Sequence, residues 1–101
     1  MNAVRFLDAA EAELDEAISY FDQQSAGLGD RFQLAVEATV ALIRDQPQIG
    51  VPLTRRVRKF RVRTFKYNVV YIPDADEILI VAIAHQKRRP RYWRRRLTSE
   101  R

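Results

Sequence analysis

The chain has 101 residues, of which 47% are hydrophobic and 31% are charged, so it has room for one domain, residues 1–101, with a single core. It contains no cysteine and one histidine, which excludes a disulfide framework and a thiolate metal site, and we expect neither a metal nor another cofactor. No stretch approaches the length of a membrane helix, and acidic side chains stand near the N-terminus where a secretory signal would be apolar, so we expect a cytoplasmic protein that binds no membrane.

The net charge of +5 conceals an uneven distribution. Residues 1–54 contain three basic and nine acidic side chains, whereas residues 55–101 contain fifteen basic and four acidic ones. This division suggests a polyanionic or acidic protein partner for the C-terminal half. The alternative is a basic surface kept only for solubility, but solubility does not require the positive charges to be concentrated in one half.

The first half of the chain predicts one strand and two helices. Residues 3–7 alternate like a short strand, and Asp8 stands three residues before Glu11, a spacing typical of a capping box. Two segments with a helical apolar period follow; a Gly27-Leu28-Gly29 break separates them and Pro47 ends the second. The short connection predicts an antiparallel helical hairpin.

The second half predicts three strands and a last helix. Residues 55–64 alternate, with Arg61 and Arg63 on the polar face, and residues 67–72 return as the next strand. After a turn, residues 78–84 form an apolar run rich in β-branched side chains, which predicts a buried central strand. Pro90 suits the first turn of a short last helix over residues 91–97. We therefore expect an α+β fold in which the hairpin covers a mainly antiparallel four-stranded sheet.

The composition changes where the expected central strand ends, at His85. The segment that follows is basic and aromatic; it contains Lys87, Arg88, Arg89, Arg91, Tyr92, Trp93, Arg94, Arg95 and Arg96. We expect the protein to act here, on one positive face formed by the arginines beyond residue 54. The purely structural alternatives are that His85 only ends the strand, that Tyr92 and Trp93 anchor the last helix, and that the final arginines are a solvated run.

The element order and several motifs together resemble the toxins of the RelE/ParE superfamily, most closely the ParE-type branch. The resemblance covers nearly the whole chain. Its motifs are the Tyr20-Phe21 pair, the start of the second helix at Gly27-Leu28-Gly29-Asp30-Arg31-Phe32, the segment from Arg61 to Tyr71, and the ending Ala84-His85-Gln86-Lys87-Arg88-Arg89-Pro90-Arg91-Tyr92-Trp93.

This resemblance implies a growth-inhibiting toxin that a cognate antitoxin neutralises in a hetero-oligomer. ParE-like members are associated with inhibition of DNA gyrase, whereas RelE-like members cut messenger RNA in the ribosomal A site. The leading expectation is the gyrase inhibitor, a binding protein rather than an enzyme. Its expected target-binding residues are Arg61, Arg63, Lys87, Arg88, Arg89, Arg91, Tyr92, Arg94 and Arg95.

The alternative, an mRNA endonuclease, would need a general base, a cation for the developing charge and an acid. His85 is the candidate base, Arg61 and Arg63 are candidates to clamp a phosphate, and Tyr92 is the candidate acid or base-stacking residue. Arginine replaces most of the lysines expected in such a nuclease and stays protonated, so His85 alone would act as base.

The antitoxin is expected to contact apolar side chains of the first helix and the two arginines of the first C-terminal strand. These residues are Leu14, Ile18, Phe21, Arg61 and Arg63, although the three apolar ones could equally fill the core. A third possibility is a non-toxic module that binds nucleic acid or a protein partner, which the charge alone would permit.

Overall fold

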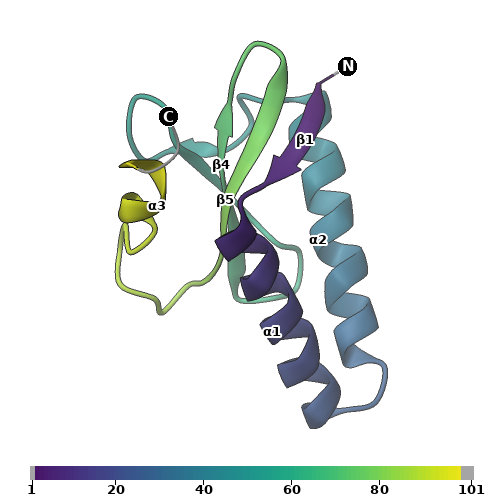
Figure 1. Ribbon diagram of the computed structural model, residues 1–101. Coiled ribbons are helices and arrows are strands. Elements are labelled where there is room, and N and C mark those ends of the chain that lie inside the picture. The colour runs from purple at the N-terminus through teal and green to yellow at the C-terminus, as the bar shows by residue number, and fades with distance from the viewer. Residues whose placement is uncertain (1, 99–101) are drawn as a thin grey trace.

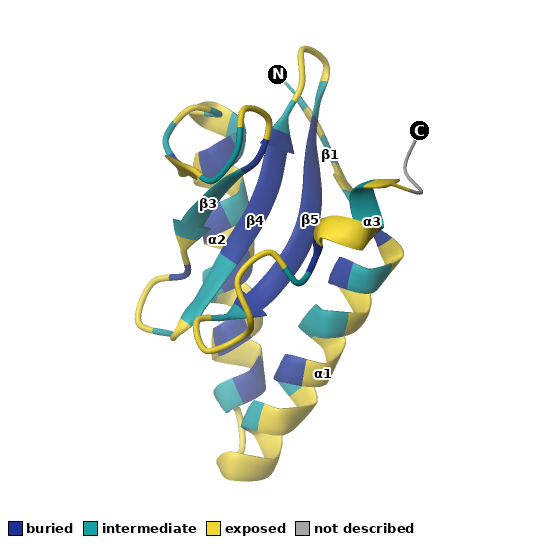
Figure 2. Cartoon of the chain, turned by 90° about the vertical axis from the view of Figure 1, so that its left-hand side faces the viewer, coloured by how far each residue is buried: buried dark blue, intermediate teal, exposed yellow. Residues whose placement is uncertain are grey.

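The sheet of this protein separates a helical hairpin from the C-terminal segment (Figure 1). The computed structural model describes residues 2–98, and none of the helices among them is long and apolar enough to cross a membrane. The hairpin lies against one face of the sheet and the last helix lies over the other (Figures 1 and 2). The elements in chain order are β1 (Ala3–Phe6), α1 (Asp8–Gln24), α2 (Leu28–Asp45), β2 (Val51–Pro52), β3 (Arg58–Arg61), β4 (Tyr67–Pro73), β5 (Glu77–His85) and α3 (Arg94–Thr98).

Five strands form one sheet in the order β1-β5-β4-β3-β2. β1 runs parallel to β5, and the other three neighbouring pairs are antiparallel. The expected α+β fold, with its hairpin, mainly antiparallel sheet and short last helix, is confirmed. The expected number of four strands is wrong, because β2 pairs Val51 with Lys59 and adds a fifth. Two residues are too few to show an alternating pattern in the sequence.

The apolar run near the C-terminus is the interior strand β5. It lies between β1 and β4, and all seven residues from Ile78 to Ala84 are buried (Figure 2). A strand that is covered on both faces is apolar at every position instead of at alternate ones. This explains why β5 was recognisable from composition alone.

Two elements in the C-terminal half, a strand and a helix, have ends that differ from the sequence predictions. β3 ends at Arg61, and Thr64 adopts a left-handed φ of 67° in the turn to β4. Arg63 therefore lies in this turn and not on a strand face. α3 begins at Arg94 and not at residue 91, because Arg91 has a left-handed φ of 61°, which a right-handed helix does not accommodate.

The hairpin begins one residue earlier than expected and closes at a glycine. The N-cap of α1 is the extended Leu7 and forms no side-chain cap bond, so Asp8 lies inside the first turn and the predicted capping box is absent. At the other end, the Gly29 N–H donates to Asp22 Oδ1 at 2.8 Å. A Cβ atom on Gly29 would lie 2.5 Å from the carbonyl oxygen of Ile18, so only glycine lets α2 approach α1 this closely.

The loop that follows α2 is tied to the core by Tyr71 of β4. The buried Tyr71 hydroxyl donates to the Pro47 carbonyl at 2.8 Å and accepts the Gly50 N–H at 2.9 Å. Burial raises the pKa of Tyr71, so the hydroxyl stays a donor. This contact holds the entry to β2 and β3, and with it the free edge of the sheet.

Gly29→Ala should lower the free energy of unfolding by about 2 kcal/mol, since the added methyl group must push α1 and α2 apart. Urea denaturation followed by circular dichroism measures this loss. Gly27→Asn is the matched control, because Gly27 has open space around its Cβ position and asparagine tolerates its φ of 84°. Equal, small effects at both positions would contradict the proposed close contact.

Candidate functional site

The segment after β5 folds into a turn, residues 85–91, which we call the cationic turn. The Arg88 N–H donates to the His85 carbonyl at 2.9 Å, and the Gln86 N–H donates to the Lys66 carbonyl at 2.9 Å, so the turn starts in a defined position beside β4. The Arg91 guanidinium donates to the Leu53 carbonyl at 2.9 Å. The left-handed backbone of Arg91 is a conformation that non-glycine residues rarely adopt, and such strain is concentrated at functional sites.

The cationic turn covers the sheet face opposite the hairpin. Trp93, which is only 4% exposed, is buried behind it and anchors the C-terminal segment, as the packing alternative expected. Between turn and sheet lies a hollow of about 170 Å³. All of its charged side chains are basic, and its polar lining comprises Lys59, Asn68, His85, Gln86, Arg88, Arg89, Arg91 and Tyr92. The hollow therefore suits an anionic group on a partner.

A carboxylate of α1 holds this C-terminal segment in place. Glu13 accepts hydrogen bonds from the Tyr92 hydroxyl at 2.5 Å and from both Arg96 Nη atoms at 2.8 and 2.9 Å. It also accepts the Ile83 N–H of β5 at 3.1 Å. We call Glu13, Tyr92 and Arg96 the clasp. The Glu13 side chain is 12% exposed and that of Arg96 is 20% exposed, so this ion pair is shielded from water.

The clasp shifts the protonation of its own members. Burial, and then the hydrogen bond to Glu13, raise the pKa of Tyr92 well above its ordinary value. The hydrogen bonds that Arg96 donates to Glu13 raise the pKa of Arg96. The guanidinium carbon of Arg88 lies 3.9 Å from the centre of the Tyr92 ring, and that of Arg96 lies 5.1 Å from it. The phenol is therefore a neutral hydrogen-bond donor whose ring contacts two cations.

Sequence reasoning missed Glu13, although a signal was present. Ala10 and Ala17 are buried positions of α1, and Glu13 stands three residues after the first and four before the second. A carboxylate at this spacing lies on the apolar face of the helix and needs a partner there. The partner, Arg96, is 83 residues away in the chain, so no local pattern could identify it.

His85 lies at the end of β5, with its ring centre 5.1 Å from that of Tyr67. Its Nδ1 atom accepts the Lys87 N–H at 3.0 Å. A nitrogen that accepts a hydrogen bond carries no proton, so the neutral ring carries its proton on Nε2. In this arrangement Nε2 is a hydrogen-bond donor, and Nδ1 would have to release the Lys87 N–H before the ring could act as a base.

Arg61 and Arg63 lie elsewhere, at a groove between α2 and β3 that we call the α2–β3 groove. The groove has a volume of about 880 Å³, and Arg61 Nε donates to the Phe65 carbonyl at 3.1 Å at its rim. Neither arginine lines the hollow that contains His85 and Tyr92. In the sheet register Arg61 pairs with Asn68, and Asn68 pairs with Ala84, so Arg61 leaves its strand on the same sheet face as the hollow but lies beyond the residues that line it.

The α2–β3 groove is mostly apolar, with a basic rim of Arg31, Arg61 and Arg63. Its exposed apolar residues were not singled out from the sequence: Leu34 is 65% exposed and Leu42 is 37% exposed. The signal was a second apolar stripe on α2, which repeats every four residues outside the core stripe and consists of Leu34, Ala38 and Leu42. A stripe on a second face indicates that something covers it.

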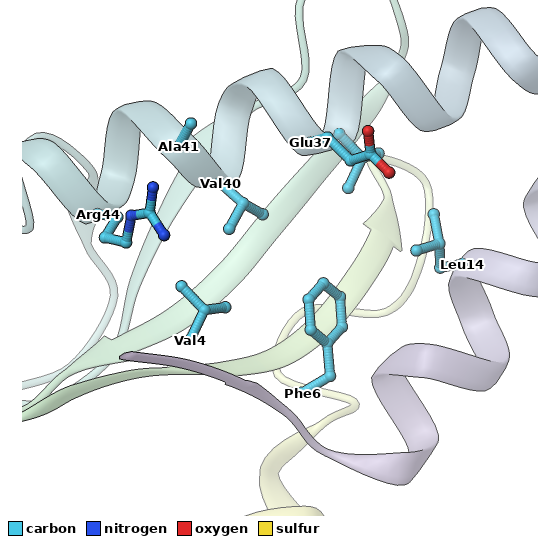
Figure 3. A pocket seen from close by; sticks show the side chains of 8 residues that line it. Val4, Phe6, Leu14, Glu37, Val40, Ala41 and Arg44 are labelled. Carbon is cyan, nitrogen blue, oxygen red and sulfur yellow. The ribbon is translucent and has the colours of Figure 1, made fainter. Parts of the chain in front are cut away.

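The three apolar residues expected to meet an antitoxin are all partly buried against the core. Leu14 lines a hollow of about 320 Å³ between the hairpin and β1, together with Glu37 and Arg44 (Figure 3). Phe21 belongs to an aromatic cluster, 5.0 Å from the Phe32 ring and 5.2 Å from the Phe65 ring. Ile18 is partly buried against the core.

Some of the basic side chains expected on one positive face have hydrogen-bond partners within the chain. Arg58 donates to the Gln48 and Gly50 carbonyls, and Arg96 belongs to the clasp. The remaining basic residues divide mainly between the cationic turn, the exposed Arg94 and Arg95 of α3, and the α2–β3 groove. Within residues 2–98, no group of three or more histidine, aspartate or glutamate side chains is arranged to hold a metal ion.

Comparisons with known proteins converge on one family. Residues 4–90 match the family described as "ParE toxin of type II toxin-antitoxin system, parDE". Toxin ParE2 of Mycobacterium tuberculosis, in two strains, is 31% identical over 88 residues, which span 86% of this chain and 84% of that toxin.

Two solved structures share the fold. One is described as "Chromosomal ParDE TA system from P. aeruginosa", with a TM-score of 0.62, 16% identity, and coverage of 84% of this chain and 96% of that one. The other is described as "The structure of YoeB dimer from Staphylococcus aureus", with a TM-score of 0.57, 16% identity, and coverage of 82% and 94%. At this level of identity, both show the fold alone.

Tyr92→Phe should lower the free energy of unfolding by about 1.5 kcal/mol at pH 8, because it removes a hydrogen bond to a shielded carboxylate. The raised pKa means that folding favours the neutral phenol, so this contribution is present below about pH 10 and is lost as the pH rises further. The difference between wild type and variant should therefore shrink above pH 10.

Urea denaturation from pH 8 to 11 measures this difference, and the other buried tyrosines cancel because both proteins retain them. Tyr20→Phe removes a hydroxyl from a side chain that is 54% exposed and should have a smaller effect at pH 8. A difference that stays constant through the alkaline range would contradict the role given to the Tyr92 hydroxyl.

Proposed function

Since this chain belongs to the family of ParE toxins of type II toxin-antitoxin systems, we propose that it inhibits growth by binding DNA gyrase in the cytoplasm. The resemblance to the RelE/ParE superfamily and its ParE-type branch is confirmed, and membership implies a cognate antitoxin as partner. The gyrase target, and neutralisation by that antitoxin, belong to the proposal.

The observation that carries the proposal is the state of the groups that a nuclease would use. His85 accepts a backbone N–H at Nδ1, and the Tyr92 hydroxyl is bonded to Glu13. Arg61 and Arg63 line the α2–β3 groove and are not among the residues that line the hollow with His85 and Tyr92. A protein that only traps its target needs shape and charge but no proton-transfer groups, and this arrangement supports that mode of action.

The cationic turn is the proposed target-binding surface. Lys87, Arg88, Arg89 and Arg91 are all exposed there, and Arg94 and Arg95 extend the charge onto α3. Several of these side chains start from a backbone that is held by hydrogen bonds, which lowers the entropy lost on binding. An anionic surface of the gyrase–DNA complex is the expected counterpart.

The α2–β3 groove is the proposed antitoxin site. Its apolar floor suits an apolar segment, and its rim of Arg31, Arg61 and Arg63 suits acidic residues that flank such a segment. This assigns Arg61 and Arg63 to the antitoxin and not to the target. The hollow beside Leu14 is a separate candidate for part of the same antitoxin.

Arg88→Ala/Arg89→Ala should raise the toxin concentration needed to inhibit gyrase supercoiling by about tenfold, because it removes two exposed cations from the target-binding surface. Its affinity for the antitoxin should stay unchanged. Arg31→Ala/Arg63→Ala is the control with equal charge loss, and it should show the reverse pattern.

Assays of supercoiling and of transcript cleavage with the same proteins distinguish the two candidate activities. Ribosome-dependent transcript cleavage with intact supercoiling would overturn the gyrase proposal in favour of the endonuclease. Normal growth on induction without antitoxin, at good expression, would favour a non-toxic binding module.

Leu34→Asp should weaken antitoxin binding by about tenfold, because a charge would enter the apolar floor of the α2–β3 groove. Its free energy of unfolding should change by less than about 0.5 kcal/mol, since the side chain is mostly exposed. Val51→Asp is the control, because Val51 is 58% exposed and lies outside the lining of the groove. Titration calorimetry with the antitoxin measures both variants, and equal affinities would exclude the groove.

A further inference from the structure

We propose that Glu13 of α1 is the positioning residue of the target-binding surface: its carboxylate holds both ends of the cationic turn and so presents Arg88 and its neighbours in one arrangement. The inference rests on the proposed function in one respect, namely that the cationic turn binds the target. Glu13 touches no target itself and acts through Tyr92 and Arg96.

The positions of the Glu13 partners carry this inference. Ile83, whose N–H bonds to Glu13 Oε1, stands two residues before the cationic turn. Tyr92, whose hydroxyl bonds to Glu13 Oε2, is the first residue after it. One carboxylate therefore brackets the turn from both sides, and each oxygen has partners on the C-terminal segment or on β5.

Tyr92 transmits the position of Glu13 to the arginines. The guanidinium carbon of the exposed Arg88 lies 3.9 Å from the centre of the Tyr92 ring. When Glu13 fixes the hydroxyl, it fixes the ring, and the ring provides the surface on which Arg88 rests. Arg96 donates to the Val81 carbonyl at 3.0 Å and connects the same group to β5.

Glu13 also offsets the repulsion among the cations. Arg88 and Arg96 both contact the ring of Tyr92, and like charges this close repel one another. The shielded carboxylate is a negative charge within hydrogen-bond distance of this cluster. Without it, the segment should spread outward and lose its ordered surface.

Stability alone does not explain a carboxylate at this position. Apolar residues in place of both Glu13 and Arg96 would avoid the desolvation that a shielded ion pair requires. A role of Glu13 in ordering a binding surface accounts for the charged pair, since pre-organised groups lose less entropy when they bind.

The test uses the full chain with Glu13→Gln, which keeps the size of the side chain and removes its charge. Glu16→Gln is the matched control, because Glu16 is exposed on the same helix and loses the same charge. Tyr92→Phe is the second variant; it removes only the hydroxyl, so the proposal stays testable if Glu13→Gln fails to fold.

In Glu13→Gln, amide hydrogen exchange across residues 85–92 should accelerate by about tenfold relative to the rest of the sheet, and Tyr92 should titrate at lower pH by tyrosinate absorbance. The toxin concentration that inhibits supercoiling should rise by about tenfold, whereas antitoxin affinity should stay within about twofold. Glu16→Gln should behave as wild type in all four measurements.

Three results would overturn the inference: unchanged exchange across residues 85–92, faster exchange spread evenly over the whole chain, or an equal loss of antitoxin affinity. A wild-type protein that leaves supercoiling intact would refute the proposed function instead. Hydrogen exchange and the Tyr92 titration would still show whether Glu13 positions the turn, so the two failures are distinguishable.

Discussion

The shielded contact between Glu13 and Arg96 joins the acidic half of the chain to the basic half. The hairpin and the C-terminal segment lie on opposite sides of the sheet (Figures 1 and 2). Their contact passes along the part of β5 that lies beyond the pairing with β1, where Glu13 accepts the Ile83 N–H and meets side chains that follow β5. The geometry of the cationic turn therefore depends on a residue of the first helix, and a change in α1 can alter a surface that α1 does not form.

The sheet keeps the two candidate interaction surfaces apart. β5 and β4 are buried on both faces and form a rigid layer, with the α2–β3 groove at one edge and the cationic turn over the opposite face. Rigid strands between two surfaces let each surface vary in sequence without disturbing the other. This separation is consistent with a toxin in which antitoxin contacts and target contacts draw on different residues.

Local sequence patterns predicted helices and strands well where the burial of a single element sets the spacing of its apolar residues. The helical period of α2 and the unbroken apolar run of β5 reflect burial of a helix stripe and of both strand faces. Element ends were less predictable. Arg91 and Thr64 interrupt regular structure through left-handed backbone angles, which neither arginine nor threonine favours, so residue type did not indicate them.

The amino-acid sequence by itself determined the fold class and the placement of most basic charge in the second half of the chain, because periodicity and composition are local properties. Its motifs resembled the family to which the comparisons assign the chain. Only the tertiary structure decided which of these charges lie together. It assigned Arg61 and Arg63 to a groove against α2, Arg88 and Arg89 to the turn, and Arg96 to a buried carboxylate. The physical reason is that these assignments depend on contacts between residues as many as 83 positions apart, which chain topology, and not residue order, brings within hydrogen-bond distance.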